Sequence, residues 1–303
     1  MKHITISDYA NKDYASYWTN KERRYLDEVE KYVIDRLLPL GGKWFLDLGC
    51  GFGRLKGLYL NRYENIVMLD YSESLLEQAI ADTDDRSFPN VHFILADIYN
   101  LPFKDNSFEI SLMTRVFHHL QEPELVIKQV RRILIQKGIM IFNFDNLRSL
   151  REIVKYWRKK SDINPFKVEH MNIGKDELLY YSHPLFVKNL LKNCEFDILK
   201  EMGIGFFYGR LFLNAYNPAA LEKKFSRIMG KYFLSMLIML KAVLLSEEQS
   251  KSVPIGKSAQ LQDLLICPDC KGPTLNRKKH KLICLNCERS YPIKGKIYDL
   301  RIH

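Results

Sequence analysis

The sequence predicts an α/β fold built on a mostly parallel sheet, followed by a small C-terminal domain. Three observations support this prediction. Short apolar runs that suit buried strands alternate with segments of helical periodicity over the first two thirds of the chain. The first of these runs leads directly into three closely spaced glycines. The C-terminal region holds two Cys-x-x-Cys pairs, which suit a metal-binding module.

The composition suits one large domain and one small one. The chain has 303 residues, of which 47% are hydrophobic, so it can build a sizeable core. Its formal net charge of +10 favours anionic partners such as nucleic acid or acidic lipid surfaces. The segment from Cys267 onward carries nine Lys/Arg and three Asp/Glu. A solvated basic face and a surface that binds nucleic acid explain this excess of positive charge equally well.

The N-terminal segment and the cysteines bear on the cellular compartment. Residues 1–14 are polar and lack the apolar centre of a signal peptide. The chain also has no uninterrupted apolar stretch of the ~20 residues that a membrane span requires. Without an export signal, paired cysteines indicate metal binding rather than disulfides. We therefore expect a cytoplasmic protein without a transmembrane segment.

The first predicted element is a helix over residues 14–38. Its apolar side chains recur at three- and four-residue spacing, and Pro39 with Gly41 and Gly42 ends the pattern.

A glycine-rich turn between two predicted strands indicates a nucleoside pocket. The strand Trp44–Leu48 runs into glycines at alternate positions, namely Gly49, Gly51 and Gly53. Glycine permits a sharp turn and lets a ligand approach the backbone closely. A second strand, Ile66–Leu69, ends in Asp70, which would lie at the strand tip where a ribose diol is bound. A tight turn without a ligand is the alternative explanation of the glycines alone.

The residues around the glycines argue against a dinucleotide. A dinucleotide fingerprint has glycine at its sixth position, where this chain has Arg54. Asp47, two residues before the first glycine, would repel phosphates. It suits a cationic ligand instead.

The stretch Trp44–Arg54 resembles the first motif of the class I S-adenosylmethionine (SAM) methyltransferases, and Leu69–Ser72 resembles their second. The resemblance implies a Rossmann-like, seven-stranded sheet, mostly parallel with an antiparallel closing hairpin. It also implies that Asp47 faces the methionine ammonium, directly or through water, and that Asp70 binds the ribose. The cofactor-binding residues expected on this basis are Asp47, Gly49, Cys50, Gly51, Gly53, Asp70, Tyr71, Asp97, Ile98 and Thr114.

The following segment continues the alternation of helix and strand. Ser72 can cap a helix over residues 73–81, and Val91–Leu95 is expected to form the third strand. Asp97 then resembles the family residue that accepts a hydrogen bond from the adenine amino group; a simple turn residue is the alternative. The fourth strand is expected at Phe108–Met113.

Two adjacent histidines follow the fourth strand, in the segment Thr114–Leu120. The segment resembles the His-His-Leu motif of many small-molecule and tRNA wobble-uridine methyltransferases. It differs from the Asn/Asp-Pro-Pro-Tyr motif of enzymes that methylate amide or exocyclic base nitrogens, which counts against such substrates. His118 and His119 are the candidate catalytic residues, because imidazole can act as a general base near neutral pH. A structural role for at least one of them is the alternative.

A basic and aromatic insertion is predicted at residues 145–182, after a helix that begins at Pro123 and a fifth strand at Gly138–Phe144. An insertion here would rise from the carboxyl ends of the strands, where open α/β sheets bind ligands, so we expect a substrate lid. Its side chains could hold a phosphate and stack a ring or base. A helix with a solvated basic face is the alternative.

The next segment is expected to close the sheet and lead to a linker. A helix at Pro184–Asn193 and an antiparallel hairpin of residues 196–201 and 205–212 are predicted. From Pro218 to Val243 a helical stripe predicts a buried helix that bridges two domains or contacts a membrane surface. Residues 246–258 have the composition of a linker. The predicted domains are therefore 1–215, 216–258 and 259–303.

Four cysteines in the last domain have the spacing of a zinc ribbon. Two pairs are separated by 13 residues, with ligands expected at Cys267, Cys270, Cys284 and Cys287. Four thiolates leave a tetrahedral Zn²⁺ no open position, so the predicted ion is structural and contributes most of the folding free energy of so small a module. Free buried thiols are the alternative. Cys50 and Cys194 lie outside this cluster and are expected in the core.

The segments around these cysteines also resemble a known family. Residues 264–273 and 287–297 look like the short zinc-ribbon activator subunit that partners tRNA, rRNA and release-factor methyltransferases. Larger versions carry an added helical part that this chain lacks. The resemblance implies an activator-like domain, which we expect to pack on the catalytic domain of the same chain.

The two resemblances together imply a SAM-dependent methyltransferase with an oxygen or nitrogen acceptor. RNA of the tRNA type is favoured by the positive charge and by the tRNA and rRNA methyltransferases that the activator subunit partners. A small-molecule or lipid-like acceptor is the alternative. A hydroxyl or ammonium acceptor needs a base, whereas a carboxylate needs none. A non-catalytic SAM-binding scaffold and a nicotinamide enzyme are further alternatives.

Overall fold

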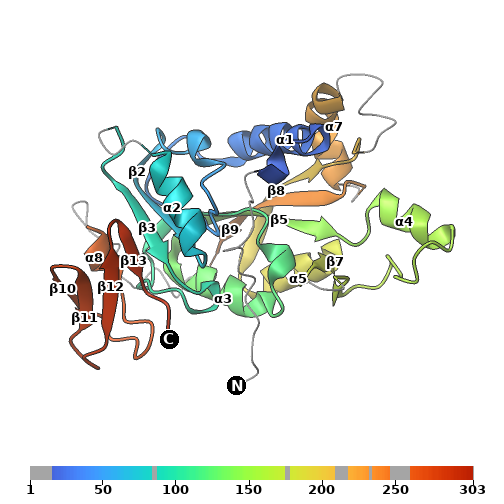
Figure 1. The fold of residues 1–303 in the computed structure, drawn as a ribbon. Helices are drawn as coiled ribbons and strands as arrows, with labels where there is room; N and C mark the ends of the chain where they lie inside the picture. The colour runs from blue at the N-terminus through green and yellow to red at the C-terminus, as the bar shows by residue number, and fades with distance from the viewer. Residues whose placement is uncertain are drawn as a thin grey trace.

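One sheet runs through the described part of the protein, and helices cover both of its faces (Figure 1). This computed structural model describes residues 16–83, 87–174, 178–208, 218–231, 234–245 and 260–302. Within these ranges, no helix reaches the length and apolar character needed to span a bilayer.

Five parallel strands form the central part of the sheet. They are β1 (Gly42–Leu48), β2 (Tyr63–Asp70), β3 (Val91–Leu95), β4 (Phe108–Met113) and β5 (Leu134–Asn146). Their order is β3-β2-β1-β4-β5, so the strand order reverses between β1 and β4. This confirms the predicted Rossmann-like, mostly parallel sheet, although β1, β2 and β5 are longer than predicted. Open sheets of this kind bind ligands beyond the carboxyl ends of the strands at the reversal point.

Two antiparallel strands, β8 (Phe196–Ile204) and β9 (Leu237–Leu244), complete the sheet beyond β5. Strand β9 lies between β5 and β8 and is antiparallel to both. The predicted antiparallel closing pair is therefore present. Its second strand, however, comes from residues 237–244 and not from residues 205–212, of which 209–212 lie outside the described ranges.

The predicted helix from Pro218 to Val243 is wrong in its second half. Helix α7 covers Pro218–Lys231 only, and the apolar segment that follows enters the sheet as β9. Strand β9 is buried along almost its whole length, so its positions are apolar on both sides, as they would be in a buried helix. The predicted bridge is therefore part of the sheet, while the predicted linker at 246–258 lies outside the described residues.

Four further helices pack on the sheet: α1 (Lys21–Leu37), α2 (Glu73–Ala81), α3 (Pro123–Ile133) and α5 (Pro184–Asn193). In Figure 1, α1 and α7 lie above the sheet, and α3 and α5 lie below it. Helix α1 begins later than predicted because the side chain of Asn20 caps it, accepting a hydrogen bond from the Arg23 amide at 2.8 Å. Ser72 occupies the cap position of α2, but its side chain makes no capping hydrogen bond.

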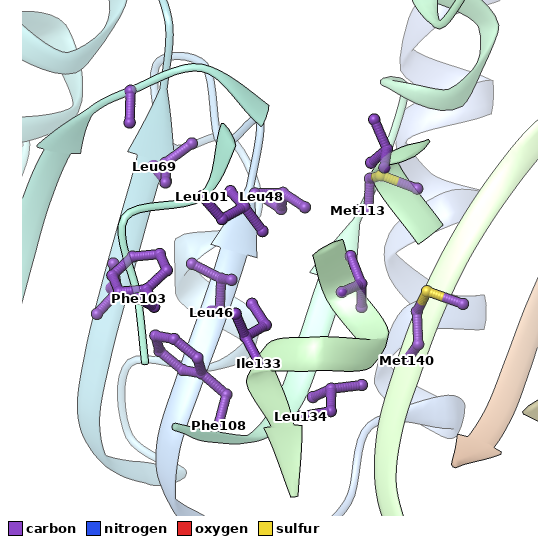
Figure 2. Packing of buried hydrophobic residues seen from close by; sticks show 14 of the residues in the cluster. Leu46, Leu48, Leu69, Leu101, Phe103, Phe108, Met113, Ile133, Leu134 and Met140 are labelled. Carbon is purple, nitrogen blue, oxygen red and sulfur yellow. The ribbon is translucent and has the colours of Figure 1, made fainter. Parts of the chain in front are cut away.

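Apolar side chains pack on both faces of the sheet in two clusters. One cluster joins the strands to α3 and α5, and Figure 2 shows part of it, including Leu46, Phe103 and Phe108. The other joins the opposite face to α1 and α7. Phe45 and Leu46 are both fully buried but belong to different clusters, as alternation along a strand requires. Burial on both faces explains why the parallel strands are continuous apolar runs.

The predicted insertion at 145–182 contains helix α4 (Leu150–Trp157) and two short strands, β6 (His170–Asn172) and β7 (Tyr180–Ser182). Strand β7 pairs in parallel with the last residues of β5 and antiparallel with β6. Helix α4 thus lies at the end of the molecule opposite the C-terminal domain (Figure 1). Its role as a substrate lid stays a prediction.

The C-terminal domain extends the sheet beyond β3. It consists of the short helix α8 (Leu261–Leu264) and strands β10 (Leu275–Lys278), β11 (Lys281–Cys284), β12 (Ser290–Lys294) and β13 (Ile297–Asp299). Strand β13 pairs in parallel with β3, and β12, β11 and β10 follow in order (Figure 1).

Further contacts join this domain to the rest of the chain. The Lys104 amide donates to the carbonyl of Leu264 at 2.7 Å, and the Ile266 amide donates to the carbonyl of Pro102 at 3.0 Å. Leu264 also belongs to the same apolar cluster as the core of β1. The C-terminal domain therefore packs on the large domain of its own chain.

Candidate functional site

A pocket opens at the carboxyl ends of β1, β2, β3 and β4. It lies where the strand order reverses, as the fold leads one to expect. The predicted residues that line it are Asp47, Gly49, Cys50, Gly51, Asp70, Tyr71, Ile98, Thr114 and His119. Gly53, Asp97 and His118 were predicted as site residues but do not line it.

The glycine turn has a left-handed backbone. The φ angle is 76° at Gly49, 55° at Gly51 and 77° at Gly53. A Cβ at Gly49 would lie 2.3 Å from a methyl carbon of Val116, whereas one at Gly51 would meet nothing within 4 Å. Gly49 is therefore needed for packing, while Gly51 leaves the backbone open to a ligand. A Cβ at Gly53 would lie 3.0 Å from the Met68 side chain, so Gly53 is needed for close packing of the turn on β2.

Asp70, at the tip of β2, is oriented by two backbone amides. Gly51 N–H donates to Oδ2 at 2.7 Å, and Ser72 N–H donates to Oδ1 at 2.9 Å. Each carboxylate oxygen has a second lone pair, so the oriented group can still accept hydrogen bonds from two neighbouring hydroxyls.

Asp47, near the end of β1, is only 2% exposed. The Tyr59 hydroxyl donates to its Oδ2 at 2.6 Å. Burial raises the pKa of Asp47 to about 7, and the hydrogen bond from Tyr59 only partly opposes this. Among the described residues no ion pair joins Asp47 to a cation, so a cationic ligand would favour its ionised form.

Thr114, directly after β4, lines the pocket with a buried hydroxyl. Its Oγ1 has no hydrogen-bond partner in the described part of the chain. Leaving such a group unpaired costs about 1–3 kcal/mol, so a polar ligand atom here would recover a lost interaction. The open face of Gly51 and the unpaired Thr114 hydroxyl both fit a bound polar ligand.

Asp97 instead has a local structural contact. Its Oδ1 accepts a hydrogen bond from the Tyr99 amide at 2.8 Å and so caps the short turn η3 (Ile98–Asn100). Burial raises the pKa of Asp97. The neighbouring side chains of Ile98 and Tyr99 line the pocket.

Sequence analysis missed a buried charge network behind the pocket. Glu30 of α1 is fully buried and accepts hydrogen bonds from the guanidinium groups of Arg54 and Arg115, and from Asn143 at 3.0 Å. Burial opposes ionisation of Glu30, but the two arginine charges hold its pKa below the usual value. Arg54 also lies over the ring of Trp18 at 3.9 Å. Because Arg54 and Arg115 line the pocket, this network attaches α1 to its wall.

One signal could have revealed this network. Glu30 lies on the apolar stripe of the first helix, four residues after Leu26 and three before Val33. A carboxylate on a buried stripe requires a cation partner.

The two candidate catalytic histidines lie on the short turn η4, which covers residues 117–119. Their ring centroids are 4.1 Å apart. Nδ1 of His119 lies 2.8 Å from the carbonyl oxygen of Leu178. Because a carbonyl only accepts, Nδ1 carries the proton, and Nε2 of the neutral ring carries the lone pair.

His118 faces an acid at the end of β5. Its Nδ1 lies 2.8 Å from Oδ2 of Asp145. Burial opposes ionisation of Asp145, but the adjacent His118 holds the pKa of this carboxyl below its usual value. His118 therefore lies against Asp145 beside the pocket, while His119 lines it.

The four predicted metal ligands gather in the C-terminal domain. The sulfur atoms of Cys267, Cys270, Cys284 and Cys287 all lie within 4.8 Å of one another. The Cys267–Cys287 and Cys270–Cys284 sulfur distances are 3.7 and 3.5 Å. A tetrahedral ion with metal–sulfur bonds of about 2.3 Å would hold its sulfur atoms about 3.8 Å apart. The donor set and its spacing therefore fit Zn²⁺.

The C-terminal domain also contacts loops that build the pocket. Asn100, in the turn η3, donates to the carbonyl of Pro268 at 3.0 Å and accepts from Lys271. The Arg301 guanidinium lies 5.6 Å from the ring centroid of Tyr71, which lines the pocket. Lys294 donates to Glu73 at the start of α2 at 2.7 Å. The cysteine loop and the segment after β13 thus support the pocket from outside.

Comparisons with protein families identify two parts of the chain. Residues 46–142 match the family described as a methyltransferase domain, and residues 259–295 match the family described as Trm112p-like protein. Malonyl-[acyl-carrier protein] O-methyltransferase from Hamiltonella defensa subsp. Acyrthosiphon pisum (strain 5AT) is 25% identical over 135 residues, which cover 43% of this chain and 50% of that protein. The chain spans about half the length of the curated relatives that it matches.

Two solved structures share the fold. A Listeria monocytogenes protein assigned as a SAM-dependent methyltransferase matches with a TM-score of 0.53 and 17% identity, over 74% of this chain and 99% of that one. A complex of the Haloferax volcanii Trm112 methyltransferase activator with a protein assigned as a methyltransferase matches with a TM-score of 0.52 and 16% identity, over 78% of this chain and 99% of the matched chain. At these identities the likeness concerns the fold alone. The family matches and the sheet agree that this chain carries a methyltransferase domain followed by a Trm112p-like domain.

Proposed function

We propose that this protein is a SAM-dependent methyltransferase that transfers the methyl group to an oxygen or nitrogen acceptor. The observation that carries the proposal is that Asp47 and Asp70 line one pocket from adjacent strands, with the glycine turn beside both. Asp70 is oriented to accept from a diol, and Asp47 is buried without an ion pair. SAM carries both matching groups, a ribose diol and an ammonium. The match to a methyltransferase domain supports the same conclusion.

The protein's own residues have mainly a positioning role in this reaction. A sulfonium methyl group is already activated, so holding the acceptor in line with it supplies most of the acceleration. Asp70 would hold the ribose, Asp47 the ammonium, and Gly51 would allow close approach of the ligand. The Thr114 hydroxyl would pair with a polar ligand atom. His119 is the candidate to take a proton from a hydroxyl or ammonium acceptor, with His118 beside it.

We further propose that the four cysteines hold one structural Zn²⁺. A closed four-thiolate site leaves no position for substrate, so the ion would maintain the shape of the C-terminal domain. Through Lys271 and Arg301 that domain would keep the turn η3 and the ring of Tyr71 in place.

The RNA acceptor expected from the net charge stays a prediction. The surface that supports it is the β10–β11 hairpin, on which Arg277, Lys278, Lys279 and Lys281 are exposed. Reversing the charge of Lys278 and Lys279 should then weaken retention on heparin and binding of a single-stranded RNA oligonucleotide. If heparin retention and RNA binding are both unchanged, this surface no longer supports an RNA acceptor.

Calorimetric titration tests the cofactor. We expect S-adenosylhomocysteine to bind and NAD not to bind. Asp70→Asn should weaken S-adenosylhomocysteine at least about tenfold, because a charge-assisted hydrogen bond contributes about 1.5–3 kcal/mol. Asp197→Asn, at an exposed position on β8, is the matched control. Binding of NAD in place of S-adenosylhomocysteine would contradict the proposal.

A further inference from the structure

A second groove, of about 650 Å³, lies between α4, the start of α1 and the loop after β8. One part of its wall is basic and consists of Arg151, Lys155, Arg158 and Lys160. The other part is largely aliphatic and includes Leu150, Val154, Leu234 and Met236. A cofactor bound in the pocket described above would not fill this groove, because the two have separate walls.

The groove adjoins the pocket along α1. Trp18, just before α1, packs against Arg54 of the pocket wall. Glu22, in the first turn of α1, lines the groove and accepts a hydrogen bond from the Tyr208 hydroxyl at 3.1 Å. The segment from Trp18 to Glu22 therefore contacts a residue of the pocket wall at one end and lines the groove at the other.

The end of β5 gives a second connection. Asp145 lies beside His118, next to the proposed methyl-transfer site. The next residue, Asn146, donates its amide proton to the carbonyl of Met236 at 2.9 Å, and Met236 lines the groove. The groove wall is thus bonded to the residue that follows the partner of His118 along β5.

The charges in the groove are unbalanced. Lys155 pairs with Glu152 at 2.7 Å. Within the described ranges, no ion pair joins Arg151, Arg158 or Lys160 to a carboxylate. Three cations on one wall favour an anionic group on the ligand.

The aliphatic wall narrows the class of ligand. Single-stranded nucleic acid is bound on aromatic faces that stack with bases. Here four aliphatic side chains meet Phe206 and Tyr208, and the Tyr208 hydroxyl is engaged by Glu22. Trp157, at the end of α4, is 68% exposed but does not line the groove. Aliphatic side chains beside cations on the groove wall suit an aliphatic chain with an anionic head group.

We propose that this groove binds the methyl acceptor and that the acceptor is an amphiphile with an aliphatic chain and an anionic head group. The head group, a phosphate or a carboxylate, lies on Arg151, Arg158 and Lys160, and the chain lies on Leu150, Val154 and Met236. The assignment of the ligand as acceptor rests on the proposed methyl transfer.

Binding of defined probes to the full chain tests this assignment. Dodecyl phosphate and dodecanoate, each below its micelle concentration, should bind, whereas inorganic phosphate and dodecyl maltoside should bind at least about tenfold more weakly. The two anionic probes together distinguish a phosphate head from a carboxylate head. The double variant Arg151→Glu/Arg158→Glu should weaken the anionic amphiphiles at least about tenfold. Lys159→Glu reverses a charge in the same exposed segment at a position that does not line the groove, and should change binding less than about twofold.

S-adenosylhomocysteine is titrated into every variant in parallel, and its affinity should be unchanged. If it binds but neither anionic amphiphile does, the groove assignment fails and the methyltransferase proposal stands. If a single-stranded RNA oligonucleotide binds in their place and loses affinity in the double variant, the acceptor class is wrong. If S-adenosylhomocysteine itself does not bind, the proposed function fails, and the assignment of an acceptor fails with it.

Discussion

Asp47 is buried beside the glycine turn with a pKa of about 7, so its charge depends on pH in the physiological range. Its folded-state pKa lies above that of an unfolded aspartate. The favourable contribution of its protonated form to stability is therefore complete below the unfolded value and is lost as pH rises through about 7. A bound ammonium group would reverse this preference, because it favours the carboxylate. The ionised Asp47 carboxylate would thus destabilise the ligand-free fold and stabilise the complex with a cationic ligand.

This pH dependence can be measured. The affinity for S-adenosylhomocysteine should fall when the pH is lowered from about 8 to about 6, because Asp47 becomes protonated. Asp47→Asn should bind about tenfold more weakly at the higher pH and should lose this part of the pH dependence. It should also raise the melting temperature of the ligand-free protein at the higher pH. A wild-type affinity that stays constant over this range would contradict the role of Asp47.

The histidine pair permits a test of base catalysis. If the acceptor is a hydroxyl or an ammonium, His119→Ala should lower kcat by about 10²–10⁴-fold with little change in S-adenosylhomocysteine affinity. His118→Ala, measured beside it, shows whether the pair with Asp145 contributes. Unchanged turnover in both variants would exclude a base at this turn and leave a carboxylate acceptor.

The pocket residues found from sequence share one property. The identities of Gly49, Gly51 and Asp70 are dictated by local backbone geometry, so a single sequence reveals them. Arg54 and Arg115 were missed because their partner, Glu30, is distant in sequence. Such a pairing leaves no local pattern, apart from the carboxylate on an apolar stripe.

At the level of elements, α1 is attached to the pocket by Glu30, and this contact can be removed by one substitution. Glu30→Gln should destabilise the protein by about 3 kcal/mol or more in urea denaturation, because two arginine charges lose their buried partner. Glu28→Gln on the same helix loses only a pair with Lys223 at its exposed face and should cost less than about 1 kcal/mol. Equal effects of the two substitutions would contradict the importance of the buried network.

The pH dependence of this contact has the opposite sign to that of Asp47. The pKa of Glu30 is lowered in the folded state. The stability that ionised Glu30 contributes is therefore present above the pKa of the unfolded state. It is lost as pH falls through the lower pKa of the folded state.

Strand β9 shows where hydrophobic periodicity fails to distinguish a strand from a helix. Strands β3 and β4 and helix α2 were predicted with the observed bounds, because each has a clear period and a clear boundary. The segment at 237–244 is apolar on almost every side, and a strand buried on both faces has no period that distinguishes it from a buried helix. Only its pairing with β5 and β8 decides its structure, and that pairing is not local.

For the whole molecule, the metal should stabilise both domains. We expect one zinc ion per chain by elemental analysis. Cys284→Ser should reduce the zinc content, unfold the C-terminal domain and expose apolar side chains such as Leu264 and Leu282, which pack in the shared core. The expected result is aggregation or a lower melting temperature that added zinc does not restore. Zinc removal from the wild type should produce the same change reversibly, and a stable, fully soluble variant would contradict the shared core.

The methyltransferase-like and Trm112p-like parts of the chain were predictable, but the way in which they join was not. The cysteine spacing and the glycine turn are strong local signals, so each domain is recognisable alone. Strand β13 covers only Ile297–Asp299, and nothing in three residues predicts a parallel pairing with β3. The short segment has its structure because the edge of β3 is available.

The pairing of β3 with β13 has a consequence for protein synthesis. The ribosome adds Ile297 about 200 residues after Leu95, which at 5–20 residues per second corresponds to about 10–40 s. During that interval the edge of β3 in the nascent chain is unpaired, and strands of other chains could pair with it. Chaperone dependence during translation should therefore concentrate in the period before the last strand emerges.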